Sequence, residues 1–288
     1  MKDLIKQIRG CASMSQQELA DAVGVTFASV NRWENGHSVP NTLAQKKLYE
    51  LCKEKNIPLA KLVIERISQE AESLEQNENR LILYHGSKSG IVGNIAPVSR
   101  QKCDFGQGFY MGTQPQQPLT LICDYERSVF YIVSLELTGL RTITVPPTLE
   151  WAMLIAYYRG KMDMIKGSQL YNRYAEMLRD YDVVNGCIAD DRMFFVLDNF
   201  FLGNITDSAL ISSLSALQLG QQVVCITQKA CDRVKIEKEI PLSFLERQCM
   251  QDISEKNRKN GVSLANRICK EHRREGRYFD EILEEEQT

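Results

Sequence analysis

The sequence predicts two domains, a small all-α domain followed by a larger α+β domain, with a helical tail after them. A chain of 288 residues is long for one compact domain, and its 43% hydrophobic residues supply enough apolar material for two cores. Helical patterning with little strand character fills residues 2–66, whereas short β-rich runs begin at Leu81. We therefore expect an all-α domain at 1–66, a linker at 67–80, an α+β domain at 81–240 and a helical tail at 241–288.

The second domain is expected to mix short apolar strands with amphipathic helices, as α+β folds do. The segment before it is polar and acidic with almost no apolar periodicity, which predicts a linker or a helical extension. The expected strands are Leu81–Tyr84, Val129–Leu137, Tyr181–Val184 and Val223–Ile226. The expected helices are Leu149–Tyr158, Gln169–Arg179 and Asp207–Leu217, followed by the charged helical tail.

Composition excludes several classes of protein. The nine cysteines lack C-x-x-C spacing and the three histidines lie far apart, so no zinc site is expected. No apolar signal segment opens the chain and no run approaches the roughly 18 apolar residues of a membrane span, so a cytoplasmic protein without membrane contact is expected. The net charge is −2, but the first 66 residues hold ten Lys and Arg against seven Asp and Glu.

The strongest local pattern lies between residues 15 and 36. Ser15 followed by Glu18 is a capping box, which starts a helix by satisfying two backbone donors. Gly24 ends that helix with a tight turn, Thr26 caps the next one, and Gly36 stops it. Two helices joined by so short a glycine-containing turn are a helix-turn-helix arrangement.

The second of these helices has an outer face suited to reading DNA. Val30 and Trp33 are expected to face inward, and the N-terminal half of such a helix enters the major groove. Asn31 can pair with adenine and Arg32 with guanine or phosphate, while Gln16 is placed to hold a phosphate. The predicted DNA-binding residues are Gln16, Thr26, Phe27, Ala28, Ser29, Asn31 and Arg32.

This segment resembles the phage-repressor and Cro-like family, also called the xenobiotic-response-element (XRE) family. The resemblance rests on Ser-Gln-x-Glu-Leu-Ala from Ser15, Gly-Val at 24–25, Arg-Trp-Glu-x-Gly from Arg32, and Pro40, and it covers residues 3–66. It implies double-stranded DNA as a partner and a homodimer, since most such repressors bind paired half-sites. The alternative is a helical bundle that keeps the shape without DNA, but the polar outer face favours DNA binding.

The second domain carries short motifs in a fixed order. They are Tyr84-His85-Gly86-Ser87, Asp104-Phe105-Gly106-x-Gly108-Phe109-Tyr110, Ala189-Asp190-Asp191 and a late strand that starts Gln221-Gln222. In this order the motifs resemble an uncharacterised bacterial family of the ADP-ribosyltransferase superfamily, over residues 81–240. The resemblance implies an ADP-ribosyltransferase-like fold, NAD as the cofactor and a macromolecular acceptor of ADP-ribose.

The resemblance also assigns roles to four residues. His85 would hydrogen-bond the adenosine ribose, and Gly86 would let the backbone approach the nicotinamide amide. Tyr110 would stack on the nicotinamide ring. Gln222 falls where related enzymes place a glutamate that stabilises the developing positive charge.

Gln222 departs from that pattern because a neutral amide orients a ribose but offers no charge. The carboxylate for catalysis is therefore left open between Asp190, Asp191, Asp104 and an acid of the target. Each residue also has a purely structural alternative. His85 is then a structural histidine, Tyr110 a core aromatic and Gln222 a polar residue at a strand start. Asp190 or Asp191 is then a helix cap.

Two functions from different classes follow. One is a DNA-binding ADP-ribosyltransferase that modifies a macromolecule, as in toxin, phage-defence or stress modules. The other is a one-component transcription regulator whose second domain binds NAD, ADP-ribose or another ligand without catalysis, which the neutral Gln222 favours. A third possibility is that the second domain serves only for protein interaction or dimerisation.

Overall fold

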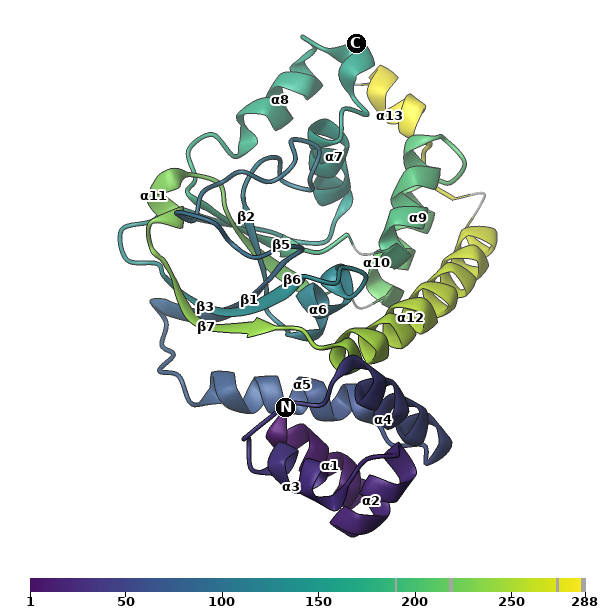
Figure 1. Ribbon diagram of the computed structural model, residues 1–288. Coiled ribbons are helices and arrows are strands. Elements are labelled where there is room, and N and C mark those ends of the chain that lie inside the picture. The colour runs from purple at the N-terminus through teal and green to yellow at the C-terminus, as the bar shows by residue number, and fades with distance from the viewer. Residues whose placement is uncertain (190, 218–219, 273–274, 286–288) are drawn as a thin grey trace.

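The structure, a computed structural model, describes residues 1–189, 191–217, 220–272 and 275–285 (Figure 1). It confirms an all-helical N-terminal region followed by an α+β domain and a helical tail. The helices of the first region are α1 (Lys2–Cys11), α2 (Gln16–Val23), α3 (Phe27–Glu34), α4 (Thr42–Glu54) and α5 (Leu59–Glu72). The strands are β1 (Arg80–Ser87), β2 (Phe109–Gly112), β3 (Val129–Glu136), β4 (Thr142–Val145), β5 (Val183–Cys187), β6 (Gln221–Cys225) and β7 (Val234–Pro241).

The remaining helices surround or follow the sheet. They are α6 (Gln116–Ile122), α7 (Leu149–Tyr158), η1 (Asp163–Ile165), α8 (Gln169–Met177), α9 (Asp191–Phe201), α10 (Asp207–Leu217), α11 (Gln228–Cys231), α12 (Phe244–Glu271) and α13 (Phe279–Glu285). The expected helices at 149–158 and 207–217 are confirmed to the residue, and the one at 169–179 ends slightly earlier. Of the helices in the described residues, none combines the length and apolar character needed to cross a membrane.

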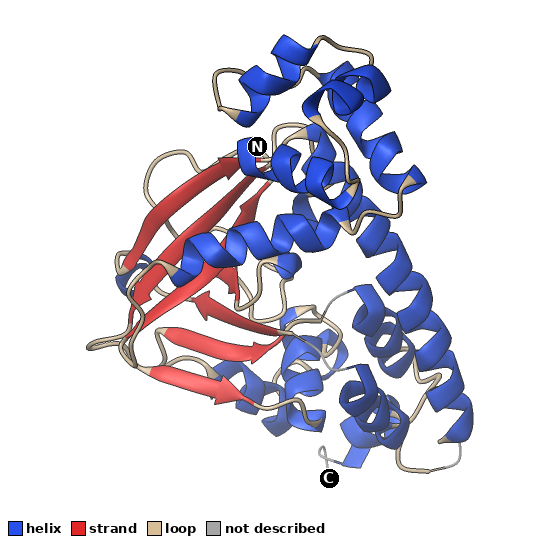
Figure 2. Cartoon of the chain, turned by 90° about the horizontal axis from the view of Figure 1, so that it is seen from below, coloured by secondary structure: helices blue, strands red, loops and turns tan. Residues whose placement is uncertain are grey.

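The seven strands form one mixed sheet in the order β4-β5-β6-β2-β1-β3-β7. Only β4 and β5 pair in parallel among the described strands, and the other neighbours are antiparallel. Most helices gather on one side of this sheet (Figure 2), and the short α11 lies on the other. The strand order brings the Tyr84-His85-Gly86-Ser87 motif on β1 close to the Gln221-Gln222 motif on β6, since both strands flank β2.

One hydrophobic core fills the space between the sheet and the helices α7, α8, α9, α10 and α13. Its large buried side chains include Trp151, Tyr174, Phe200 and Phe279. A second core lies on the other face of the sheet, around Tyr131 and beneath α11. These cores fix the sheet on which the motif residues stand.

The helix-turn-helix region shares a third core with the sheet and with α12. Leu48 and Ile67 of the N-terminal helices lie in one apolar cluster with Phe130 of β3 and with Leu245 and Met250 of α12. Helix α12 then continues past α9 and α10 (Figure 1). The two halves of the chain are therefore packed together, not joined by a tether alone.

The structure differs from the expected elements in several places, and β2 and β4 are two of the strands that were not expected. Helix α5 continues to Glu72 with Ile67 and Ala71 buried, so much of the expected linker is helix. Strand β7 was not expected because its charged residues hide the alternation, and it is an edge strand, where charges are common. The tail is not an appendage, since α12 packs against both halves of the chain.

Candidate functional site

The helix-turn-helix forms through the predicted local contacts. The Glu18 backbone N–H donates to Ser15 Oγ at 3.2 Å, and the Ser15 N–H donates to Glu18 Oε2 at 2.7 Å. Gly24 has φ of 74°, a left-handed conformation that favours glycine. Thr26 Oγ1 accepts from the Ser29 N–H at 3.2 Å, which caps α3.

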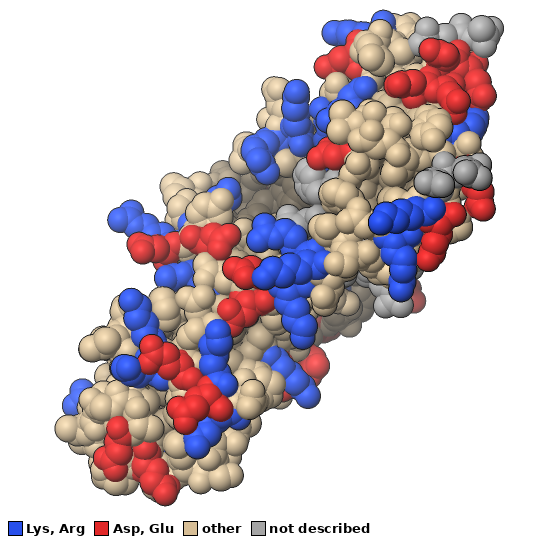
Figure 3. All heavy atoms as spheres, turned by 90° about the vertical axis from the view of Figure 1, so that its right-hand side faces the viewer, with Lys and Arg blue, Asp and Glu red and all other residues tan. Residues whose placement is uncertain are grey.

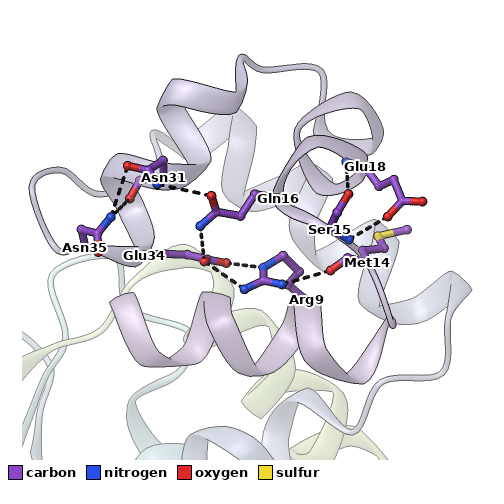
Figure 4. A network of polar contacts seen from close by, with 8 residues as sticks. All are labelled: Arg9, Met14, Ser15, Gln16, Glu18, Asn31, Glu34 and Asn35. Atoms are coloured by element: carbon purple, nitrogen blue, oxygen red, sulfur yellow. Dashed lines mark hydrogen bonds and ion pairs between the residues drawn. The ribbon is translucent and has the colours of Figure 1, made fainter.

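A polar network joins α1, α2 and α3 around Glu34 (Figure 4). The Glu34 carboxylate accepts from Arg9 Nε at 2.6 Å and from Gln16 Nε2 at 2.6 Å. Gln16 Oε1 in turn accepts from Asn31 Nδ2 at 3.3 Å. Burial alone would raise the pKa of Glu34, but the hydrogen bonds from Arg9 and Gln16 bring that pKa below its ordinary value. The network holds Gln16 and Asn31, two of the predicted DNA contacts, in a defined orientation.

Helices α2 and α3, which carry or adjoin the predicted DNA-binding residues, lie at the end of the molecule away from the sheet (Figure 1). Thr26, Phe27, Ala28 and Arg32 are exposed, whereas Gln16, Ser29 and Asn31 are partly buried. Phe27 is 47% exposed, unusual for a large apolar side chain at a helix start. Their contact with DNA stays a prediction, and the accessible outer face of α3 is what that prediction requires.

Replacing Arg32 by alanine is expected to weaken specific DNA binding by about 1–3 kcal/mol, because one base or phosphate contact is lost. The measurement is fluorescence anisotropy with a duplex that the wild-type protein selects from a random pool. Lys61→Gln, an exposed change on α5, is the matched control. Equal affinity of the wild-type and Arg32→Ala proteins would contradict the predicted orientation of α3.

In the second domain, His85 lies where β1 and β2 separate. Among the described residues these strands share one paired position, Tyr84 with Gly112. His85 Nδ1 lies 2.7 Å from the Tyr110 carbonyl oxygen, and the imidazole stacks on Phe109 with ring centroids 4.2 Å apart. Because a carbonyl only accepts, Nδ1 carries the proton.

The surroundings of His85 keep its ring neutral. Burial lowers the pKa of His85, and the hydrogen bond to the Tyr110 carbonyl opposes this only in part. A neutral ring protonated at Nδ1 leaves Nε2 as a hydrogen-bond acceptor. That is the chemistry a ribose hydroxyl needs from a partner.

Tyr110 contributes its carbonyl to His85, but its side chain lies on the opposite face of the sheet. Side chains alternate along a strand, and the pairing of Tyr84 with Gly112 puts Tyr110 on the face of Tyr84. The Tyr110 hydroxyl donates to the Gly106 carbonyl at 2.8 Å and accepts from the Phe105 N–H at 3.0 Å. Its ring therefore shapes the glycine-rich turn before β2, and the stacking on a nicotinamide ring stays a prediction.

Gly86 is required by packing. A Cβ at this position would lie 2.8 Å from Ile122 Cγ2 and 3.0 Å from the Pro118 carbonyl oxygen. Helix α6 therefore sits directly on β1 at Gly86. The approach of the Gly86 backbone to a nicotinamide amide stays a prediction.

Gln222 belongs to a buried polar network that no sequence motif predicts. Its Nε2 donates to Asp104 Oδ2 at 3.1 Å and to the Cys187 carbonyl at 2.9 Å. Asp104 is also paired with Arg159 at 2.6 Å and accepts from the Ala189 N–H at 3.2 Å. Arg159 lies in a helical stretch without any motif, so no local signal marked it.

The pairing of β2 with β6 puts Gln222 on the face of Tyr110, away from His85. Its neighbour Gln221 therefore lies on the face of His85, is exposed, and donates from Nε2 to Cys187 Sγ at 3.0 Å. The structure thus brings together Gln222 and Asp104, and separately His85 and the Tyr110 carbonyl. Of the other two candidates, Asp190 lies outside the described residues, and Asp191 begins α9.

The comparisons agree with this division of the chain. A family model described as "Protein of unknown function (DUF3990)" matches residues 81–236, more than half of the chain. A helix-turn-helix model matches residues 5–62, which supports a DNA-binding regulator with an XRE-type domain. No curated protein and no solved structure matches the chain. The described residues hold no group of three or more His, Cys, Asp or Glu side chains placed to bind a metal ion.

Proposed function

We propose that this chain, which belongs to the DUF3990 family of proteins of unknown function and begins with a helix-turn-helix domain, is a one-component DNA-binding regulator. Its second domain binds an NAD-type nucleotide and thereby changes the affinity of the first domain for DNA. The observation that carries this proposal is the shared core of the two halves. A ligand that alters the sheet or α12 acts directly on the packing of α4 and α5.

The nucleotide site is proposed at the His85 face of the sheet. His85 offers a neutral acceptor at Nε2, and the exposed Gln221 amide lies on the same face. NAD presents two ribose diols, which donate to and accept from such groups. The resemblance to ADP-ribosyltransferases supports NAD or ADP-ribose as the ligand.

Binding without catalysis is supported by the state of Gln222. Its amide is neutral, buried and already donates to Asp104 and to a backbone carbonyl. Moving it towards a ligand would break both hydrogen bonds, and each contributes about 0.5–1.5 kcal/mol to stability.

The test is calorimetric titration of NAD into wild-type, His85→Ala and His272→Ala proteins. We expect at least a tenfold loss of affinity in His85→Ala, equivalent to about 1.4 kcal/mol, and none in His272→Ala. Thermal unfolding and DNA binding check that His85→Ala is folded, since its ring packs on Phe109. The DNA affinity of the wild-type protein should change about 5–150-fold with NAD.

A wild-type protein that binds neither NAD nor ADP-ribose contradicts the ligand assignment. NAD binding that leaves DNA affinity unchanged contradicts regulation by the ligand. Either result leaves the DNA-binding function to be judged on its own assay.

ADP-ribosyl transfer is a second candidate, because the Asp104 carboxylate lies 3.1 Å from Gln222 and places a charged group beside the Gln221-Gln222 motif. On this reading the protein releases nicotinamide from NAD and transfers ADP-ribose to a macromolecular acceptor. Incubation with labelled NAD and a cell extract separates the two candidates. Nicotinamide release with label transfer supports the transferase, and binding without release supports the regulator.

A further inference from the structure

We propose that α12 carries a second, sequence-independent DNA-binding surface, formed by Lys256, Lys259, Arg267 and Lys270. We call these four residues the α12 stripe. The inference rests on the proposed DNA-binding function and adds to it a site outside the helix-turn-helix. Its partner is the phosphate backbone of duplex DNA.

The charge of this segment is unlike that of the chain as a whole. Residues 256–270 contain five Lys and Arg and no Asp or Glu, in a chain of net charge −2. Figure 3 looks onto the side of the molecule along which α12 runs. Lys and Arg gather near the middle of this view, with some Asp and Glu beside them. A local excess of positive charge attracts polyanions even when the net charge is negative.

The geometry of a helix places the four cations on one side. At about 100° per residue, Lys256, Lys259, Arg267 and Lys270 fall within roughly 80° of one another. All four are exposed, whereas Ile268 is buried on the opposite side. The core side of α12 is thus occupied by the protein and the stripe faces solvent.

The residues between the cations are suited to a nucleic acid surface. Asn260, Ser263 and Asn266 lie on the same side and are exposed. Short amides and hydroxyls also bind phosphate oxygens. From Lys256 to Lys270 the helix rises about 21 Å, which matches roughly six base pairs of duplex.

The stripe is held at a fixed position relative to the helix-turn-helix. The first turns of α12 pack against α4 and α5, and Arg66 pairs with Glu246 at 2.5 Å in a buried setting. The Tyr49 hydroxyl donates to Asp252 Oδ2 at 2.5 Å, one turn before the stripe. DNA held by the stripe therefore has a defined orientation towards α3.

One member of the stripe has a competing acid within the protein. Lys259 Nζ lies 4.0 Å from Glu255, but the two side chains are 80% and 63% exposed. An exposed pair of this kind is worth little and exchanges readily for a phosphate. Each phosphate neutralised by a cation releases counterions and steepens the salt dependence of binding by about 0.9.

The test compares two quadruple variants on a random-sequence duplex of about 40 base pairs, by anisotropy over a range of salt. One variant replaces the α12 stripe: Lys256→Gln, Lys259→Gln, Arg267→Gln and Lys270→Gln. The control removes the same charge elsewhere on the second domain: Arg141→Gln, Lys166→Gln, Arg179→Gln and Lys235→Gln. All eight side chains are exposed, so both variants should keep the wild-type unfolding temperature.

The logarithm of the association constant falls as the logarithm of the salt concentration rises. We expect this slope to become less steep by about 3–4 in the stripe variant, and the affinity near 0.1 M salt to fall at least tenfold. The control variant should stay close to wild type. An unchanged slope in the stripe variant, or an equal fall in the control, overturns the inference. Binding of the wild-type protein distinguishes this failure from failure of the proposed function: if the wild-type protein binds neither the random-sequence duplex nor any duplex selected from a random pool, DNA binding itself is wrong.

Discussion

Replacing Glu246 by glutamine is expected to destabilise the protein by about 3–5 kcal/mol, because it leaves the charge of Arg66 buried without its carboxylate. The two side chains are 11% and 4% exposed, and the pair links α5 to the start of α12. Glutamine keeps the capping position after Ser243, so the change isolates the charge. The measurement is thermal or denaturant unfolding, in which we expect a fall of about 10 °C in Tm.

Two companion variants make the result specific. Arg66→Met added to Glu246→Gln should recover most of the loss, because no uncompensated charge remains. Glu75→Gln, at a side chain that is 81% exposed, should change stability by less than about 0.5 kcal/mol. A small effect of Glu246→Gln would show that the Arg66–Glu246 pair contributes little to the coupling of the two halves.

The same pair predicts a dependence on pH. Burial by itself would raise the pKa of the Glu246 carboxyl, but Arg66 and hydrogen bonds with Ser243 hold that pKa below its ordinary value. A lowered folded-state pKa stabilises the protein above the unfolded value, and the stabilisation is lost as the pH falls below about 4.5. In Glu246→Gln this part of the acid destabilisation should be absent.

Replacing Asp104 by asparagine is expected to cost about 3–5 kcal/mol as well, because Asp104 neutralises the buried guanidinium of Arg159. The change also weakens the acceptor used by Gln222 and by the Ala189 N–H. The measurement is denaturant unfolding followed by circular dichroism.

The matched control is Asp180→Asn, which removes a carboxylate from an exposed pair with Arg141 at 3.6 Å. That pair should contribute less than about 1 kcal/mol. If Asp104→Asn kept full stability but altered NAD turnover, the network would have a catalytic role, and this result would favour the transferase function. Loss of stability with unchanged NAD binding would identify the network as structural.

The sequence determined the helix-turn-helix almost completely. The capping box at Ser15, the glycine turn at Gly24 and the cap at Thr26 act within a few residues, so local pattern was enough to place α2 and α3. The strands at 81–84, 129–137 and 223–226 were also identified, because buried runs of apolar residues are visible without knowledge of their partners.

The candidate site in the second domain was decided by tertiary structure. A strand exposes alternate residues to opposite faces, so the register between β2 and β6 determines that Gln221, not Gln222, shares a face with His85. The partner of Asp104 is Arg159, which lies 55 residues away and carries no motif. Local sequence contains neither fact.

The relation between the two halves was likewise beyond the sequence. The segment at 67–80 is polar enough to suggest a tether, and the tail after 241 suggests an appendage. Long-range packing of Leu245 and Met250 against α4 and α5, with the buried Arg66–Glu246 pair, makes α12 a bridge between the domains. Local sequence determines elements whose hydrogen bonds form within a few residues, such as capped helices. The faces of strands and the partners of buried charges depend instead on contacts between distant residues.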